Sequence, residues 1–136
     1  HRGSVERPGL VLALDADTGT ACDGMALRVA PGTEEATLAY LRERELVSSA
    51  YVEKTLDVQL EDGRTVAALV YVIDAEHDQY CGGLPLEEQA QIISGAVGGM
   101  GPNTEYLFNT AAHLTQIGLH DPSLAWLHDR VKTLCA

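Results

Sequence analysis

The chain has 136 residues and a formal net charge of −11, and 46% of its residues are apolar. These values are ordinary for one globular domain with a modest core. Because only nine residues are Lys or Arg, the composition weighs against binding to nucleic acid or to an anionic membrane surface. A small-molecule or protein partner is favoured instead.

The first half of the chain is dominated by strand patterns. The apolar run Leu10–Leu14 and the alternating run Cys22–Val29 predict two antiparallel strands joined by a short turn. Alternation from Tyr51 onward and the apolar run Thr65–Ile73 predict a second pair, and we expect Thr65–Ile73 to be covered on both faces. Asp62-Gly63 lies between the two runs and is the strongest hairpin signal in the sequence, because glycine accepts a positive φ.

The stretch Thr33–Tyr51 combines a helix with a dense group of ionisable side chains. Thr33 can cap this helix, and Leu38 and Leu41, with Ala39 as a further candidate, should form its buried stripe. The helix ends in the alternating charges of Arg42–Glu45. Such a pattern is usually a solvated face with weak ion pairs. The alternative is that one glutamate faces inward and serves as a general acid or base.

Three helices are predicted in the second half. They begin at Pro85, which suits a first helical position, at Asn103, a good N-cap, and at Asp121-Pro122. The first should end near Val97, because Gly98–Pro102 cannot continue a helix. Apolar residues at helical spacing should form the core: Leu86, Ala90, Ile93 and Val97, then Leu107, Phe108, Ala111 and Leu114, then Leu124, Leu127, Val131 and Leu134. Strands followed by helices predict an α+β fold with a largely antiparallel sheet.

The cysteines and histidines indicate neither disulfides nor a metal site. Cys22, Cys81 and Cys135 are odd in number and widely spaced, which favours free thiols in a reducing compartment. The five histidines never occur at the i, i+4 spacing of a metal-binding helix. No apolar run approaches the roughly 20 residues of a membrane helix. We therefore expect an intracellular, cytoplasmic protein without a metal or a membrane partner.

The sequence contains no signature of a serine or cysteine hydrolase. The glycine-rich segment Gly95–Gly101 is similar to a phosphate loop only superficially, since it follows a helix and lacks the Lys-Ser/Thr pair. It is either a turn between helices or a wall whose backbone N–H groups meet an anionic ligand.

Three segments of the chain resemble one known family, in the same order. They are His1-Arg2-Gly3 with the strand pattern after it, the helix end Tyr40–Glu45, and Gly101–Leu107, which reads Gly-Pro-Asn-Thr-Glu-Tyr-Leu. The last lies within a longer similar run, Asp74–Leu114. Together these segments resemble the ChaC-like family of glutathione-specific γ-glutamylcyclotransferases over nearly the whole chain.

The resemblance implies a fold and a reaction. The implied fold is an α+β domain with a small, partly closed, mainly antiparallel β-barrel and flanking helices. The implied reaction splits glutathione into 5-oxoproline and cysteinylglycine without water, metal or cofactor, by attack of the substrate's α-amine on its own γ-amide carbonyl. The enzyme must hold the γ-glutamyl arm curled and move protons at the two nitrogens.

The resemblance also implies the site residues. It assigns general acid/base catalysis to Glu45, with Glu43 as the fallback, and this role requires partial burial of the carboxyl group. Tyr51, Asn103, Tyr106 and Arg2 are implied to bind substrate in a cavity that Glu45 faces. Each has a structural alternative: an N-cap for Asn103, a packed aromatic for Tyr106 and a frayed terminus for Arg2.

One family feature is missing from the sequence. Members of the family carry a Tyr-Gly-Ser-Leu motif on the first strand, and this sequence has no such motif. We therefore expect residues 1–136 to form a single γ-glutamylcyclotransferase-like domain that lacks its N-terminal strand. Two alternative functions stay open: ring closure of other γ-glutamyl amines or peptides, and a non-catalytic binding domain of the same fold.

Overall fold

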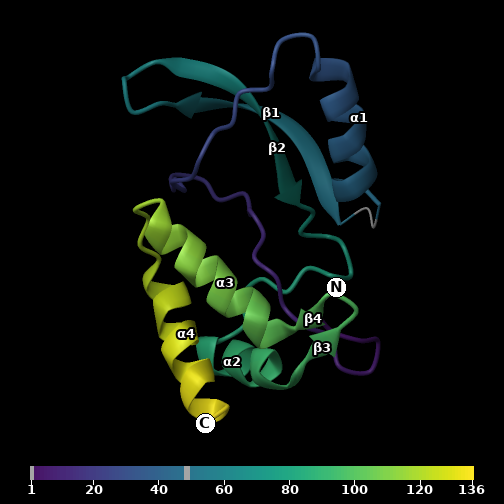
Figure 1. Ribbon diagram of the computed structural model, residues 1–136, viewed down its shortest axis with the longest axis vertical. Coiled ribbons are helices and arrows are strands. Elements are labelled where there is room, and N and C mark those ends of the chain that lie inside the picture. The colour runs from purple at the N-terminus through teal and green to yellow at the C-terminus, as the bar shows by residue number, and fades with distance from the viewer. Residues whose placement is uncertain (1, 48–49) are drawn as a thin grey trace. The chain divides into compact units, whose positions relative to one another are not determined.

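The computed structural model describes residues 2–47 and 50–136. Its helices and strands, shown in Figure 1, belong to two compact units. One unit consists of the residues up to Leu12 together with Gly83–Ala136, and the other is Ala13–Gly82. The prediction that the whole chain is a single domain stays a prediction, and the two units are described in turn.

In its described residues, the Ala13–Gly82 unit contains one helix and one antiparallel hairpin. These elements are α1 (Glu34–Glu45), β1 (Tyr51–Gln59) and β2 (Thr65–Ile73). The strands pair from Tyr51 opposite Ile73 to Gln59 opposite Thr65. Both predicted strands of this pair are therefore confirmed, and α1 runs beside the hairpin (Figure 1).

Local turn chemistry explains the hairpin. Gly63 has a φ of 88°, and its N–H donates to the carbonyl of Leu60 at 3.0 Å. The Asp62 carboxylate accepts the N–H of Arg64 at 3.0 Å. A side chain at Gly63 would be strained in this conformation, so the predicted Asp-Gly turn is confirmed.

The hairpin is covered less than the sequence pattern predicted. Val72 is buried, but Leu69 on β2 is 40% exposed, and Val52 and Leu56 on β1 are 42% and 43% exposed. The prediction that Thr65–Ile73 is covered on both faces is therefore wrong. A continuous apolar run does not distinguish a strand buried on both faces from one with an open face.

Two other predicted strands are also absent. Within the described residues 2–47, α1 is the only regular element, so Leu10–Leu14 and Cys22–Val29 are irregular. The main chain at Leu10 and Leu12 hydrogen-bonds to side chains, and the Leu14 carbonyl accepts the N–H of Ile73 at 2.8 Å. Strand-like alternation in Cys22–Val29 has no partner strand to bury it, and Leu27 is 84% exposed.

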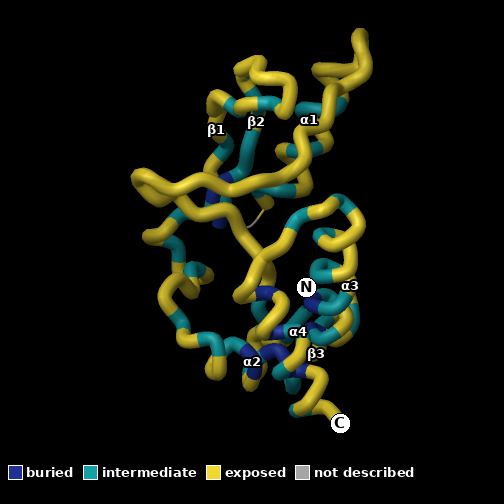
Figure 2. Tube along the Cα trace, turned by 90° about the vertical axis from the view of Figure 1, so that its left-hand side faces the viewer, coloured by how far each residue is buried: buried dark blue, intermediate teal, exposed yellow. Residues whose placement is uncertain are grey.

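The other unit is built around three helices. They are α2 (Leu86–Gly95), α3 (Asn103–Gln116) and α4 (Pro122–Leu134), and the short strands β3 (Val97–Gly98) and β4 (Gly101–Pro102) form a tight hairpin between α2 and α3. The core gathers the apolar stripes of all three helices: Ala90, Ile93, Leu107, Leu124, Leu127 and Val131. In Figure 2 this unit carries most of the buried trace. The predicted stripes are confirmed, apart from the end of the first helix.

The α2 helix ends two residues before the predicted boundary. Ala96 is extended, with φ −84° and ψ 137°, and its carbonyl accepts the N–H of Asn103 at 2.9 Å. Val97, predicted as a core residue, is 60% exposed on β3. The glycines that follow allow the chain to fold back into the β3–β4 hairpin, which removes Val97 from the helix face.

The N-terminus of α4 is capped as its sequence predicts. The Asp121 carboxylate accepts the N–H of Leu124 at 3.0 Å, and Pro122 occupies the first helical position. Three of the four predicted core residues on α4 are buried, and Leu134 packs against them half-buried.

An ion pair between α4 and α2 should make stability depend on pH. Arg130 Nε and Nη2 donate to the two Glu87 carboxylate oxygens at 2.9 and 2.8 Å, and these bonds hold the pKa of Glu87 below its ordinary value of 4.5. Because the pKa of Glu87 is lower in the folded than in the unfolded protein, the ionised group stabilises the fold at pH values above its unfolded-state pKa. This stabilisation is lost as the pH falls through the folded-state pKa. Glu87→Gln should therefore be less stable than wild type at neutral pH in urea unfolding. The difference should vanish well below pH 4.5, and a constant difference would contradict the prediction.

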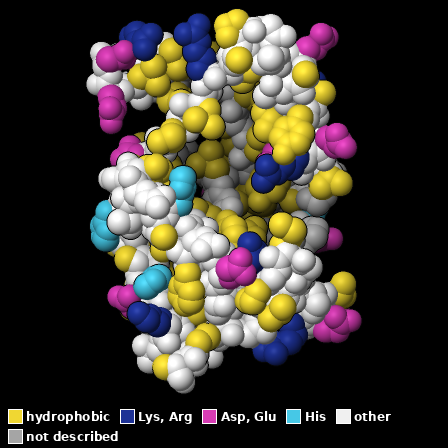
Figure 3. Space-filling model, viewed as in Figure 1, with side chains coloured by type: hydrophobic (Ala, Val, Ile, Leu, Met, Phe, Trp, Pro, Cys, Tyr) yellow, Lys and Arg dark blue, Asp and Glu magenta, His cyan; other side chains and the backbone are white. Residues whose placement is uncertain are grey.

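The surface is mixed in character. In the face that Figure 3 draws, acidic side chains are scattered rather than gathered in one patch. None of the helices in the described ranges is long and apolar enough to cross a membrane. In those same ranges the sheets are two-stranded, so the fold is α+β with antiparallel strands, and no closed barrel is seen.

Candidate functional site

Glu45 is the last residue of α1 and is partly buried. Its side chain is 33% exposed, whereas Glu43 on the same helix is classed as exposed. Its one described ion pair is the 3.8 Å contact between Glu45 Oε1 and Arg44 Nε, which is long for a hydrogen bond. The carboxyl group is therefore partly shielded from solvent, and among the described residues no short ion pair holds it.

The predicted helix cap uses a different contact. Thr33 lies at the N-cap of α1, but its hydroxyl donates to the Ala30 carbonyl at 2.6 Å. The Glu34 carboxylate instead accepts the N–H of Gly32 at 2.9 Å. Thr33 therefore closes the preceding turn, and the prediction that its side chain caps the helix is wrong.

The sequence did not reveal a polar network beside Glu45. Arg42 Nε and Nη2 donate to the Glu53 carboxylate at 3.0 and 2.9 Å, and the Tyr71 hydroxyl donates to Glu53 Oε1 at 2.9 Å. These three residues come from α1, β1 and β2. Arg42 and Glu53 are eleven residues apart, so helical spacing could not identify the pair. The only signal was the hairpin itself, whose register places Glu53 opposite Tyr71.

Electrostatics ties this network to Glu45. The hydrogen bond from Arg42, and then that from Tyr71, hold the pKa of Glu53 below its ordinary value. Burial raises the pKa of Tyr71 most, the bond to Glu53 adds to it, and the negative charge of Glu45 contributes further. Glu45 is thus close enough to Tyr71 for its charge to act there. The Glu53 carboxylate is therefore committed to its hydrogen bonds with Arg42 and Tyr71.

Tyr51 begins β1 in the same unit. It is half-buried and lies opposite Ile73. Tyr51 and Glu53 are two residues apart on one strand, so their side chains project from the same face of the hairpin. The structure therefore places Tyr51 on the face that carries the Glu53 network.

Asn103 is completely buried in the other unit and clamps the N-terminal segment. Its Oδ1 accepts the N–H of Leu10 at 2.7 Å, and its Nδ2 donates to the Leu10 carbonyl at 2.7 Å. Gly9 makes this approach possible, since a Cβ there would lie 2.9 Å from Asn103 Oδ1. Asn103 is the first residue of α3, and Pro102 is the N-cap, so the N-cap alternative is wrong. The Asn103 amide therefore makes the two hydrogen bonds to the Leu10 backbone that a neighbouring strand would otherwise make.

Tyr106 and Arg2 lie next to this clamp. The Tyr106 hydroxyl accepts the N–H of Leu12 at 3.0 Å, and the Arg2 guanidinium carbon lies 5.8 Å from the centre of the Tyr106 ring. Arg2 Nη1 also donates to the Pro102 carbonyl at 3.3 Å and lies 3.7 Å from Glu105 Oε2. With its side chain only 16% exposed, Arg2 is held in place rather than frayed.

The candidate residues thus form two groups, one in each unit. Asn103 and Tyr106 both hold the segment Leu10–Leu12 and line a small pocket of about 70 Å³ with it, and Arg2 lies against the Tyr106 ring. Glu45 and Tyr51 belong to the other unit, beside the Arg42, Glu53 and Tyr71 network.

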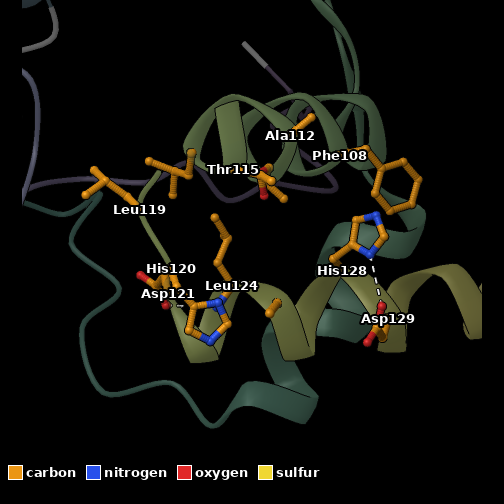
Figure 4. A pocket seen from close by; sticks show the side chains of 12 residues that line it. Phe108, Ala112, Thr115, Leu119, His120, Asp121, Leu124, His128 and Asp129 are labelled. Carbon is orange, nitrogen blue, oxygen red and sulfur yellow. Dashed lines mark hydrogen bonds and ion pairs between the residues drawn. The ribbon is translucent and has the colours of Figure 1, made fainter. Parts of the chain in front are cut away.

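A larger pocket lies between α3 and α4 and contains none of the candidate residues. It has a volume of about 240 Å³, and Figure 4 shows its wall, where the Phe108 and His128 rings meet edge to face at 5.1 Å. His128 Nδ1 lies 3.1 Å from the neighbouring Asp129 carboxylate. Across the parts of the chain that the structure describes, three or more His, Cys, Asp or Glu residues nowhere gather as a metal site would need.

Comparison with known proteins identifies the family. A family model described as ChaC-like protein matches residues 1–134. The chain belongs to the ChaC-like protein family. This confirms the resemblance carried by Tyr40–Glu45 and Gly101–Leu107.

The ChaC-like chain is similar to curated members from bacteria and animals. It is 35% identical over 135 residues to the glutathione-specific gamma-glutamylcyclotransferase of Escherichia coli, covering 99% of the chain and 58% of that protein. It is 33% identical over 138 residues to glutathione-specific gamma-glutamylcyclotransferase 1 of Homo sapiens, covering 98% of the chain and 62% of that protein. The chain therefore spans about three fifths of the length of these relatives.

Solved structures show the fold of this ChaC-like chain. A yeast gamma-glutamyl cyclotransferase specific to glutathione superposes with a TM-score of 0.67 at 22% identity, covering 77% of the chain and 56% of the yeast one. A second structure of the yeast protein gives a TM-score of 0.65 at 20% identity, covering 79% and 58%. The predicted α+β class is confirmed at this level.

Proposed function

We propose that the protein is a γ-glutamylcyclotransferase that converts glutathione to 5-oxoproline and cysteinylglycine. Membership of the ChaC-like family, with the E. coli relative at 35% identity, is the observation that carries the proposal. Glu45 supports it, because it ends the Tyr40–Glu45 segment that resembles the family and carries a carboxyl group that can accept and return a proton.

The reaction needs two proton transfers and one ring closure. The α-amine of the γ-glutamyl group attacks the γ-carbonyl carbon, a carbon–nitrogen bond forms, and the bond to the cysteinyl nitrogen breaks. Glu45 takes a proton from the attacking ammonium and delivers one to the leaving nitrogen, so protons balance without water or a cofactor. Holding the chain curled converts the attack into an intramolecular step with a large entropic advantage.

The remaining site residues are proposed to bind the substrate. Arg2 supplies a positive charge suited to a substrate carboxylate, and Tyr51 and Tyr106 supply hydroxyl groups. Asn103 acts indirectly, because both polar atoms of its amide already hold Leu10. Its part is to shape the segment Leu10–Leu12 next to Tyr106.

The decisive experiment is incubation of the full-length protein with glutathione, followed by chromatography of 5-oxoproline and cysteinylglycine. We expect both products in equal amounts. Parallel incubations with γ-glutamyl amino acids test the alternative substrates. One relative, from Arabidopsis thaliana, keeps this alternative open, because its name, gamma-glutamylcyclotransferase 2-3, does not mention glutathione. If 5-oxoproline formed from γ-glutamyl amino acids but not from glutathione, the substrates would be other γ-glutamyl amines. If no compound gave a product, a non-catalytic binding domain would be favoured.

We further propose that the β1–β2 hairpin belongs to a partly closed antiparallel barrel. The Ile73 N–H on the outer edge of β2 donates to the Leu14 carbonyl at 2.8 Å, which is the kind of bond that a neighbouring strand makes. A crystal structure of the protein should show a further strand paired with this edge.

A cytoplasmic location is proposed from the cysteines. Cys22, Cys81 and Cys135 are free and exposed, and exposed thiols suit a reducing compartment. Fractionation of cells that produce the full-length protein should recover it with cytoplasmic markers, and recovery with secreted proteins would contradict the proposal.

A further inference from the structure

The helix that carries Glu45 is weakly anchored by packing. Within α1, which is described over its full length, no residue is buried, and Leu38 and Leu41 are only half-buried. Apolar burial normally supplies most of the energy that fixes a helix on its neighbours. The position of the last turn of α1 must therefore depend strongly on other contacts.

The Arg42–Glu53 pair is the strongest of these contacts. Arg42 Nε lies 3.0 and 3.2 Å from the two Glu53 oxygens, and Nη2 lies 2.9 Å from Oε2. A guanidinium that faces a carboxylate in this forked way fixes direction as well as distance. The Glu53 side chain is 21% exposed, so the pair is partly shielded from water and salt at its carboxylate end.

Tyr71 completes the contact from the second strand. It lies opposite Glu53 in the hairpin register, and its hydroxyl donates to Glu53 Oε1 at 2.9 Å. Glu53 is thus held by two elements, by β2 through Tyr71 and by α1 through Arg42. Arg42 and Glu45 are three residues apart on the same helix, so they share a face of its last turn.

We propose that Arg42, Glu53 and Tyr71 form a positioning network that fixes the last turn of α1 on the β1–β2 hairpin and so orients the Glu45 carboxylate. This inference rests on the proposed catalytic role of Glu45. In this proposal the three residues act through the helix and make no contact with the reacting atoms. A shift of about 1 Å in a catalytic group is enough to lower turnover by up to about 100-fold.

The test is Glu53→Gln in the full-length protein. Glutamine keeps the size of the side chain but removes the charge that holds Arg42. We expect kcat for 5-oxoproline formation to fall by about 10- to 100-fold, with KM changed by less than about threefold, because the substrate contacts remain. Tyr71→Phe should also lower kcat, but less than Glu53→Gln does, because Arg42 keeps its ion pair with Glu53.

A matched control exists elsewhere in the chain. Glu87 pairs with Arg130 in the same forked geometry, at 2.9 and 2.8 Å, between α2 and α4. Glu87→Gln removes an equivalent ion pair far from Glu45 in the sequence, and kcat should stay near that of wild type. The charge-swapped double variant Arg42→Glu with Glu53→Arg should recover part of the lost turnover. Equal kcat in Glu53→Gln and Glu87→Gln would overturn the network.

A measurement without substrate separates this inference from the proposed function. Hydrogen–deuterium exchange of the α1 amides should be faster in Glu53→Gln than in wild type or Glu87→Gln, because the last turn opens more often. Wild-type protein that forms no 5-oxoproline would refute the proposed function, while faster α1 exchange would still support the anchoring. Unchanged α1 exchange in Glu53→Gln would refute the network even if glutathione is cleaved.

Discussion

Glu45→Gln should lower the rate of 5-oxoproline formation from glutathione by about 100- to 10,000-fold, the range that general acid/base catalysis contributes. Glutamine has the shape of glutamate but neither accepts nor returns a proton near neutral pH. The substrate contacts are unaffected, so KM should change little and the loss should be in kcat. Product chromatography over a range of glutathione concentrations measures both quantities.

The matched control is Glu43→Gln on the same helix. Glu43 is exposed and lies two residues from Glu45 in the sequence. The Glu43→Gln variant should therefore keep most of the wild-type turnover. Circular dichroism of both variants would establish that each is folded. If Glu45→Gln retained near-native turnover, the catalytic assignment would be wrong; if the loss appeared in Glu43→Gln instead, the role would move to that residue.

Local chemistry explains what the sequence predicted correctly about the fold. The β1–β2 hairpin depends on Asp62-Gly63, where a positive φ and a side-chain hydrogen bond act within a few residues. The start of α4 depends on Asp121 and Pro122 in the same way. Signals of this kind need no knowledge of the rest of the chain, and both elements formed where they were expected.

Two of the errors share a different cause, since each of these two involves a partner distant in sequence. Leu10–Leu14 has the composition of a strand, but ninety-three residues separate Leu10 from the Asn103 side chain that takes its backbone hydrogen bonds. Asn103 itself has the sequence context of an N-cap, and only the fold shows that Pro102 has that place. A single polar residue before a helix is compatible with both arrangements.

The candidate site was predictable to a similar extent. Tyr40–Glu45 and Gly101–Leu107 identified the family, which pointed to Glu45, Asn103 and Tyr106. The Arg42, Glu53 and Tyr71 network could not be found in this way, because it joins a helix to two strands. Its members became neighbours only once the hairpin register was known.

Asn103→Ala should destabilise the helical unit by about 2–4 kcal/mol. The substitution removes two hydrogen bonds of 2.7 Å and leaves the N–H and carbonyl of Leu10 without these partners. An unsatisfied buried polar group costs about 1–3 kcal/mol, so two groups that are partly shielded give the stated range. Trp126, the only tryptophan in the sequence, lies on α4 in the same unit, so its fluorescence during urea unfolding reports the loss directly.

Asn109→Ala provides the comparison, because Asn109 is an exposed residue of the same helix. Its free energy of unfolding should stay within about 0.5 kcal/mol of wild type. Asn103→Asp is a stricter test: it keeps the acceptor for the Leu10 N–H but places a carboxylate oxygen where Nδ2 donates to the Leu10 carbonyl. It should therefore destabilise the unit at neutral pH and recover part of the stability when acid protonates the new carboxyl group, which then donates again. If Asn103→Ala and Asn109→Ala were equally stable, the clamp on Leu10 would contribute nothing to the fold.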